Sequence, residues 1–548
     1  MVLALLLLSL QAQTKFGTSV EVRVVNIDVV VTDKQGHRVS GLTRDDFEVL
    51  EDGRRQTITN FYEAKQSTGG LQPADAGVNA AAPQEQPPSE ARPRRFVFFI
   101  DNDSLNPLVR KQFFLGLRKF VDVQLRPGDQ ASVINWSRTG LQIAAPLTED
   151  RGVLKAAIDA AEAAPSPTAS RSNYTRVRQT CIRDLDLVNS GRMSMVTAYA
   201  DCVNVVRQET AVMVNDSRLL MNAINVAMTI AAGAEGKKVL VLAGSSLPQK
   251  PGHEMFRFAN LLFARMMRSF DAPNEQNSEE DLKMQKEMIE RLARSANAHG
   301  VSLYTVDAPM AIDGVEIQTK TGGQDFGIDF LRMENTEAAM GTLAEMTGGM
   351  TLFRPSDFTV ALGSVASDLD SFYSIGYRPG DDIGRDRNVV VRVKKGDYVV
   401  RSRQTYAPKT AEEQMSDRVI ANIYSPAKSE MPVTIKTGAP KPGEKGNFTV
   451  PIEVSFPSTL TLLPEDAKLV GGFTTYIAVG NKQGVLSALS RSPQPVAVPV
   501  AEEAVFRKSP ITYGVTLTIK PGENLVSIAV VDQVSRVVGY ARTLIQTP

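Results

Sequence analysis

The stretch Phe96-Val-Phe-Phe-Ile100, directly followed by Asp101, decides the fold class of the central part of the 548-residue chain. It is short and wholly apolar, which is typical of a parallel strand that is covered on both faces. Further strand-like runs follow at 131–136, 238–242 and 301–306. Segments with apolar residues at helical spacing alternate with these runs or follow them, at 113–125, 152–164, 284–299, 336–346 and 358–369. This alternation predicts an α/β domain over residues 95–375, with a doubly wound, mainly parallel, Rossmann-like sheet.

Strand-forming segments flank this α/β region on both sides. Residues 15–64 contain alternating runs, such as Val20, Val22 and Val24, that predict strands. A segment of this size is too short to bury an independent core. Further strands predicted at 372–377, 388–393 and 398–403 are natural partners for it. We therefore expect one β module, formed by residues 15–64 and completed by residues 376–407.

The remaining segments are assigned from composition and spacing. Residues 65–94 are rich in Gly, Ala, Pro and Gln, which predicts a flexible linker. Residues 165–232 form an insertion into the α/β domain that is polar at first and then helical by pattern. Residues 408–430 are predicted to be a second linker. The strands and turn signals that recur over residues 431–548 predict a C-terminal β-sandwich.

The charge balance and the scarcity of metal-binding side chains exclude several classes of function. The chain has 61 basic and 61 acidic residues, so it offers no overall positive charge for binding nucleic acid. Two cysteines and three histidines are too few for an all-protein zinc or iron–sulfur site, which needs about four nitrogen or sulfur ligands. The histidines are also far apart in sequence, so we expect no histidine-based catalytic triad.

The first residues indicate export from the cytoplasm. The run from Met1 to Leu10 is almost entirely apolar, too short to span a bilayer as a helix, and typical of the apolar region of a signal peptide, which we assign to residues 1–14. The alternative is the start of a buried strand or helix, but nothing amphipathic follows. No later segment reaches 18 uninterrupted apolar residues. We expect a periplasmic or extracellular protein without an integral membrane segment in the mature chain.

The two cysteines, Cys181 and Cys202, lie 21 positions apart within the insertion. In an exported protein an isolated pair of this kind predicts a disulfide between two helices or loops. The alternative is two free, buried thiols. A redox role is not expected, because the chain contains no Cys-x-x-Cys motif.

Several motifs, taken in order, resemble the von Willebrand factor type A family. They are the strand ending in Asp101, Leu125-Arg-Pro-Gly-Asp129 before the next strand, and Gly236-Lys-Lys-Val-Leu-Val-Leu242. The flanking segments Val29 to Gly36, Gly41 to Gly53, Gly300 to Ala308 and Phe372 to Pro379 are similar to the bacterial VWFA-related branch of that family. The resemblance covers about residues 20 to 407 and implies the α/β fold described above, with binding as its activity.

The resemblance also implies a place for a metal-ion-dependent adhesion site. The family's motif, Asp-x-Ser-x-Ser, places a carboxylate and two hydroxyls on Mg²⁺, and hard divalent cations prefer such oxygen ligands. Here the motif is degenerate, because Asp101 is kept but Asp103 and Leu105 replace the two serines. Candidate ligands for a divalent cation are Asp101, Asp103, Ser104 and, from a second loop, Thr210. The family's later aspartate is absent, and Ser245 or Ser246 takes its place. The alternative is that Asp101 and Ser104 only cap the loop or the next helix.

These observations lead to one expected function and two alternatives. We expect a non-enzymatic, exported binding or adhesion protein that uses its von Willebrand type A-like domain to recognise a protein or cell-envelope ligand. The first alternative is ligand binding that depends on a divalent cation, such as Mg²⁺, held at Asp101 and Asp103. The second is a metal-dependent hydrolase that uses the same two carboxylates, against which the missing third carboxylate and the scarcity of histidines argue.

Overall fold

The computed structural model describes residues 24–64, 93–105, 107–165, 169–244, 247–264, 279–307, 322–380 and 385–548. The predicted signal peptide and nearly all of the predicted 65–94 linker lie outside these residues. So do Ser245 and Ser246. Among the helices that the structure describes, none combines the length and the apolar character that a membrane span requires.

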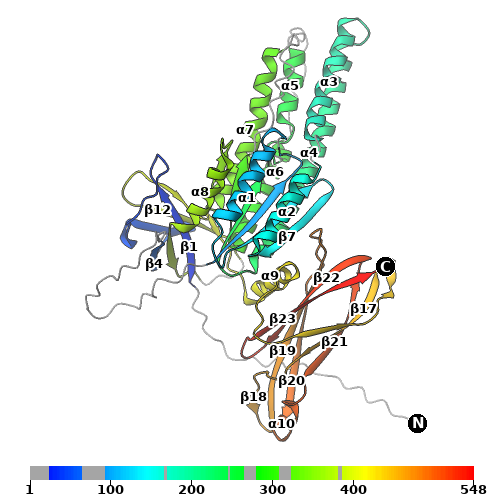
Figure 1. The fold of residues 1–548 in the computed structure, drawn as a ribbon. Coiled ribbons are helices and arrows are strands. Elements are labelled where there is room, and N and C mark those ends of the chain that lie inside the picture. The colour runs from blue at the N-terminus through cyan, green and yellow to red at the C-terminus, as the bar shows by residue number, and fades with distance from the viewer. Residues whose placement is uncertain are drawn as a thin grey trace.

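A six-stranded sheet forms the centre of the molecule (Figure 1). Its strands lie in the spatial order β10 (Thr351–Phe353), β9 (Val301–Asp307), β8 (Lys237–Ala243), β5 (Arg94–Asp101), β6 (Gln130–Ser137) and β7 (Gly140–Thr148). All neighbours are parallel except β6 and β7. When the strands are numbered 1 to 6 in chain order and read from the β7 edge, their spatial order is 3-2-1-4-5-6, which is the order of doubly wound sheets. The prediction of a mainly parallel α/β sheet is confirmed.

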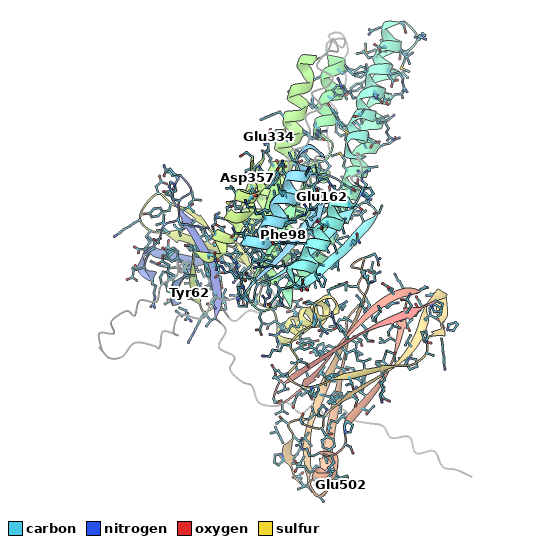
Figure 2. All side chains as sticks on the ribbon, in the orientation of Figure 1. Tyr62, Phe98, Glu162, Glu334, Asp357 and Glu502 are labelled. Carbon is cyan, nitrogen blue, oxygen red and sulfur yellow. A yellow bond between two sulfur atoms is a disulfide. The ribbon has the colours of Figure 1, made fainter. Side chains whose placement is uncertain are left out.

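Helices cover both faces of this sheet. One face packs against α1 (Pro107–Val123), α2 (Arg151–Ala163) and α8 (Phe358–Asp370), and the other against α4 (Met195–Ala232), α6 (Glu279–His299) and α7 (Gly322–Met346). Successive residues of β5 alternate between these two cores, as expected for a buried strand: Phe98 faces the α1 side, whereas Val97 and Phe99 face the α4 side. Phe98 lies in the middle of this domain in Figure 2.

A helical extension rises from the central domain (Figure 1). It consists of α3 (Ala169–Asn189), the first half of α4, α5 (His253–Ala264) and the first part of α7, and it has an apolar core of its own that includes Val177, Val206 and Phe263. Within the predicted insertion, α3 and α4 run as two long helices. The 38-residue α4 belongs to both parts, because its second half packs on the central sheet.

Strands from both sides of the central domain form the β module. One sheet has the order β13 (Val399–Arg401), β1 (Val25–Thr32), β11 (Phe372–Tyr377) and β4 (Ile58–Ala64), and the other has β14 (Thr405–Tyr406), β12 (Arg387–Val393), β2 (Phe47–Glu51) and β3 (Arg54–Gln56). The two sheets enclose one apolar core that includes Ile27, Val49 and Ile375. The predicted domain boundary at residue 375 therefore falls inside β11.

A buried polar network fixes the β module to the central domain. The Asp368 carboxylate, on α8, accepts hydrogen bonds from the Tyr304 hydroxyl (2.7 Å) and from the Arg401 guanidinium (2.8 Å), and it also contacts Arg38. Asp368 is 3% exposed. Because a buried carboxylate is costly unless charged partners and hydrogen bonds satisfy it, these contacts hold the module in one position.

Residues 431–548 form two antiparallel sheets around a shared core. The first contains β15 (Thr434–Thr437), β16 (Lys441–Pro442), β17 (Phe448–Phe456) and β21 (Ile511–Ile519). The second contains β18 (Leu463–Glu465), β19 (Lys468–Gly480), β20 (Ser490–Pro499), β22 (Gly522–Asp532) and β23 (Val538–Thr547). Core residues such as Val450, Phe473 and Ile528 come from both sheets, which makes this part a sandwich.

The segment 408–430 is not only a linker, as the sequence led us to expect, because it contains helix α9 (Ala411–Tyr424). A capping box starts this helix: the Thr410 side chain accepts from the Glu413 backbone N–H, and the Glu413 side chain accepts from that of Thr410. Val419 and Ile423 then join an apolar cluster that also contains residues of α4, β19 and β22. Helix α9 thus packs between the central domain and the sandwich (Figure 1).

Candidate functional site

The loop that follows β5 lies at the carboxyl edge of the sheet and is buried. Asp101, Asn102, Asp103 and Ser104 are all less than 9% exposed. The Ser104 hydroxyl donates to Asp101 Oδ2 (2.6 Å), and the backbone N–H groups of Ser104 and Leu105 both lie 3.2 Å from the Asp101 carbonyl oxygen. Asp101 therefore organises the turn through its backbone carbonyl, and its carboxylate holds the Ser104 side chain.

Gly244, directly after β8, closes over this loop. Its φ is +149°, and a Cβ atom added there would lie 2.6 Å from both Asp101 Cβ and Ser104 Oγ. Real side chains do not approach so closely, so only glycine fits at this position. The parallel pairing of β5 with β8 brings the two strand ends together.

Asp103 points to different partners from Asp101. Its Oδ2 atom accepts from the backbone N–H of Arg138 (2.7 Å), just after β6, and the Arg138 guanidinium lies 2.7 Å from Asp216 Oδ2 on α4. Burial raises the pKa of Asp103, although the hydrogen bond from Arg138 opposes this. The other oxygen, Oδ1, is buried without a hydrogen-bond partner among the described residues.

Thr210 lies on α4 and contacts the start of α5. A Cβ atom at Gly252, whose φ is +75°, would lie 2.0 Å from Thr210 Oγ1, so the two residues are in close contact. The Thr210 hydroxyl oxygen is buried and has no hydrogen-bond partner in the described parts of the chain. Thr210 therefore contacts the turn that precedes α5.

The loop is anchored by polar residues that sequence reasoning missed. The Asn102 side-chain amide donates to Asn135 Oδ1, on β6, and to the Ala161 carbonyl (3.1 Å) at the end of α2. The Arg110 guanidinium donates to the same Ala161 carbonyl (2.8 Å) and to that of Ala164 (2.9 Å). These bonds satisfy carbonyl groups that the last turn of a helix leaves without partners. The roles depend on strand order, which local sequence does not reveal.

A further carboxyl group, Asp307, lies at the end of β9 on the same edge. It is 4% exposed. Burial raises its pKa to about 6, the nearby carboxylate of Glu337 contributes to this rise, and Arg354 opposes it. The edge therefore carries carboxyl groups after β5 and β9, each in a different electrostatic environment.

The residues present fit a divalent cation poorly. Asp101 and Ser104 keep a carboxylate and a hydroxyl together, but the Leu105 side chain, 2% exposed, packs in the apolar core and supplies no ligand. Asp103 Oδ2 already accepts from the Arg138 backbone N–H, and the nearby positive charge of the Arg138 side chain disfavours a cation beside Asp103. In the described residues, no three His, Cys, Asp or Glu side chains are grouped so as to hold a metal ion.

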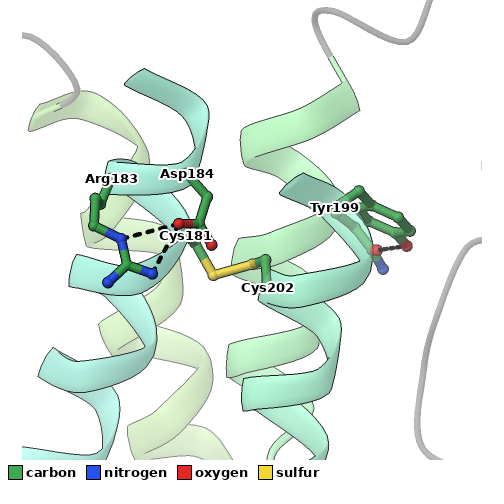
Figure 3. The surroundings of a disulfide bond; sticks show 6 residues. Cys181, Arg183, Asp184, Tyr199 and Cys202 are labelled. Carbon is green, nitrogen blue, oxygen red and sulfur yellow. Dashed lines mark hydrogen bonds and ion pairs between the residues drawn. A yellow bond between two sulfur atoms is a disulfide. The ribbon is translucent and has the colours of Figure 1, made fainter. Parts of the chain in front are cut away.

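The disulfide predicted between Cys181 and Cys202 is confirmed. It joins α3 to α4 in the helical extension, with a Cα–Cα distance of 4.8 Å (Figure 3). Both residues are fully buried. Three positions before Cys202, Tyr199 donates its hydroxyl to Asn260 Oδ1 on α5 (2.9 Å), so a polar contact ties the same region of α4 to a third helix.

Comparisons with known proteins show no family for this chain. No family model matches it, and no curated protein matches it. A structural-genomics target solved by X-ray crystallography has 11% identity and a TM-score of 0.16, covering 22% of this chain and 91% of its own. A protein described as ApaA, from Bordetella pertussis, has 9% identity and a TM-score of 0.15, covering 22% and 97%. A β-glucosidase from Listeria innocua has 10% identity and a TM-score of 0.12, covering 84% and 46%. Likenesses this weak carry no argument about fold or function.

Proposed function

We propose that this protein is an exported, non-enzymatic binding protein of the von Willebrand type A kind. It recognises a protein or cell-envelope partner with the carboxyl edge of its central sheet and with the helical extension beside that edge. The doubly wound strand order, with Asp101 at the end of β5, the first strand of this sheet in chain order, supports the assignment to this kind of domain. In open α/β sheets, ligands bind outside the carboxyl ends of the strands.

The helical extension is the single observation that carries this proposal. It projects from the central domain, and a disulfide joins two of its helices. Its surface includes large apolar side chains that the described parts of the chain leave exposed: Phe330 on α7 is 61% exposed, Val196 on α4 is 53% exposed, and Leu261 on α5 is 37% exposed. Partly buried aromatic and aliphatic anchors supply much of the energy of protein interfaces.

Affinity capture from a cell-envelope extract tests the proposal. The intact chain is immobilised as the natural sequence, as Phe330→Ser and as Leu544→Ser. Leu544 is the matched control, since it is 51% exposed but lies on β23 of the sandwich. We expect the natural chain and Leu544→Ser to capture the same partner, and we expect Phe330→Ser to capture much less of that partner. Equal retention by all three would contradict the proposed surface.

The same capture separates the cation-dependent alternative. Because the Asp101 loop fits a divalent cation poorly, capture is expected to be unchanged when EDTA replaces Mg²⁺, and isothermal titration of the intact chain with Mg²⁺, Mn²⁺ or Ca²⁺ is expected to show no saturable binding. Saturable binding that Asp101→Ala abolishes, together with capture that EDTA abolishes, would instead establish cation-dependent recognition at Asp101 and Asp103.

A further inference from the structure

A cavity of about 770 Å³ lies between the β module and the amino-terminal edge of the central sheet. The first residues of β5, β8 and β9 line one side, and residues of β1, β4 and β11 line the other. Its volume falls in the range of about 300 to 1,000 Å³ that is usual for small-molecule sites, and such sites favour junctions between domains. The cavity is at the opposite edge of the sheet from the Asp101 loop.

Four charged groups in its wall form ion pairs with one another. Arg94 is 4% exposed, and its guanidinium lies 2.6 Å from Asp129 Oδ2 and 3.0 Å from Asp370 Oδ1. Arg126 pairs with the other oxygen of Asp370. The Lys238 ammonium donates to the Ala232 carbonyl (2.7 Å) at the end of α4. These groups are thus already provided with partners.

Lys237 and Arg403 have fewer carboxylate partners than Arg94, which pairs with two. Both interact with the carboxylate of Asp28, whose Oδ2 atom lies 3.3 Å from the Lys237 ammonium, and the carboxylate of Asp370 also acts on Lys237. Arg403 has no carboxylate within ion-pair distance in the described parts of the chain. It donates to the Asn26 carbonyl, and its Nε atom is buried without a hydrogen-bond partner there. Burial lowers the pKa values of both side chains. A buried charge that lacks a counter-charge is costly.

An aromatic surface adjoins these two cations. The Lys237 ammonium lies 3.3 Å from the centre of the Phe372 ring. The Tyr62 ring packs edge-on against Phe372, with 6.3 Å between ring centres, and both residues line the cavity. Figure 2 shows Tyr62 on the β module. Flat apolar surface beside unbalanced positive charge suits a ligand that is itself part apolar and part anionic.

We infer that this cavity binds a small organic anion, with a carboxylate or phosphate group recognised by Lys237 and Arg403 and an apolar part placed against Tyr62 and Phe372. The anion supplies the counter-charge that Asp28 alone does not, and charge-assisted hydrogen bonds to Arg and Lys are the stronger kind. This site is independent of the proposed partner-binding surface, and neither inference depends on the other.

Isothermal titration of the intact chain tests this inference. The probes are phthalate for an aromatic carboxylate, phenyl phosphate for a phosphate ester, and benzyl alcohol as the neutral control, all at one ionic strength. We expect saturable one-site binding of at least one anion and none of benzyl alcohol. Arg403→Gln and Lys237→Gln should each weaken it by about tenfold or more, because each removes a charged hydrogen bond. Lys436→Gln, on an exposed lysine of β15, should leave it unchanged.

Two outcomes would overturn the inference: no saturable binding of either anion, or equal binding by the natural chain and by both cavity variants. Circular dichroism and thermal unfolding establish that each variant is folded. Arg403→Gln removes a cation that has no carboxylate partner at ion-pair distance, so its unfolding temperature should not fall appreciably. If Lys237→Gln fails to fold, Arg403→Gln alone decides the outcome, with Arg403→Lys expected to recover part of the affinity.

Discussion

Gly244 directly follows β8 and packs closely against Asp101 and Ser104 at the end of β5. We predict that Gly244→Ala destabilises the protein by about 1 to 3 kcal/mol, because the new Cβ atom collides with Asp101 and Ser104 and because φ of +149° is unfavourable for alanine. The midpoint of urea unfolding measures the change. Gly514→Ala is the matched control, since a Cβ atom there meets nothing within 4 Å. Equal midpoints for the two variants would show that the Gly244 contact is not constraining.

Asp307, at the carboxyl edge of the sheet, should make the folding stability of the protein depend on pH. Its pKa is raised to about 6 in the folded chain, from a usual value of 3.8, so between these pH values the folded state holds a proton that the unfolded state has released. Stability should therefore fall as pH rises from about 4 to 6, by at most about 3 kcal/mol. Asp307→Asn should remove this loss.

Urea unfolding of the natural chain and of Asp307→Asn at pH 4 and pH 7 measures this effect. The variant should gain stability relative to the natural chain on going from pH 4 to pH 7. A difference between the two proteins that is the same at both pH values would contradict the raised pKa.

At the scale of single residues, sequence reasoning reached only part of the candidate site. Asp101 and Ser104 were expected either to hold a cation or to cap the loop or the next helix, and the structure pairs their side chains with each other. Asp103 instead contacts Arg138, 35 positions away, because the pairing of β5 with β6 brings the two loops together. Contacts of this kind depend on strand order, which a single sequence does not encode locally.

At the scale of elements, the disulfide stiffens the extension that we propose as a binding surface. The double variant Cys181→Ser/Cys202→Ser opens a link across 21 positions of chain and should cost about 3 kcal/mol in the chain-entropy model. We expect faster amide hydrogen exchange in α3 and in the first half of α4, with little change in the central sheet. Uniformly faster exchange throughout the central domain, or none in α3, would contradict a local role for the bond.

The elements that sequence reasoning missed have physical features in common. Strand β7 is an edge strand that carries Pro146 and pairs with β6 through register shifts, so it lacks a regular apolar pattern. Strand β10 is only three residues long. Helix α9 did have a local signal, the Thr410 and Glu413 capping box, but residues 408–430 were expected to be a linker. By contrast, long apolar strands such as β5 and β8 were located within about two residues of their observed ends.

At the scale of the whole molecule, the two edges of the central sheet face different structures. The carboxyl edge lies below the helical extension, and the amino edge faces the β module across the cavity lined by Lys237 and Arg403. Helix α9 and the sandwich pack against the α4 side of the same domain. The central domain is thus covered by its neighbours on one edge and one flank, which leaves the extension as its most projecting part.

Site-specific photo-crosslinking in cell-envelope extract is the most direct test of the account. A photoreactive residue replaces Phe330 or Leu261 on the extension in the intact chain, or Leu544 or Val485 on the sandwich as exposed apolar controls. We predict that both extension positions crosslink to the same partner and that neither control does. Crosslinks that form only from the sandwich positions, or equally from all four positions, would contradict the claim that the extension and the carboxyl edge form the binding surface.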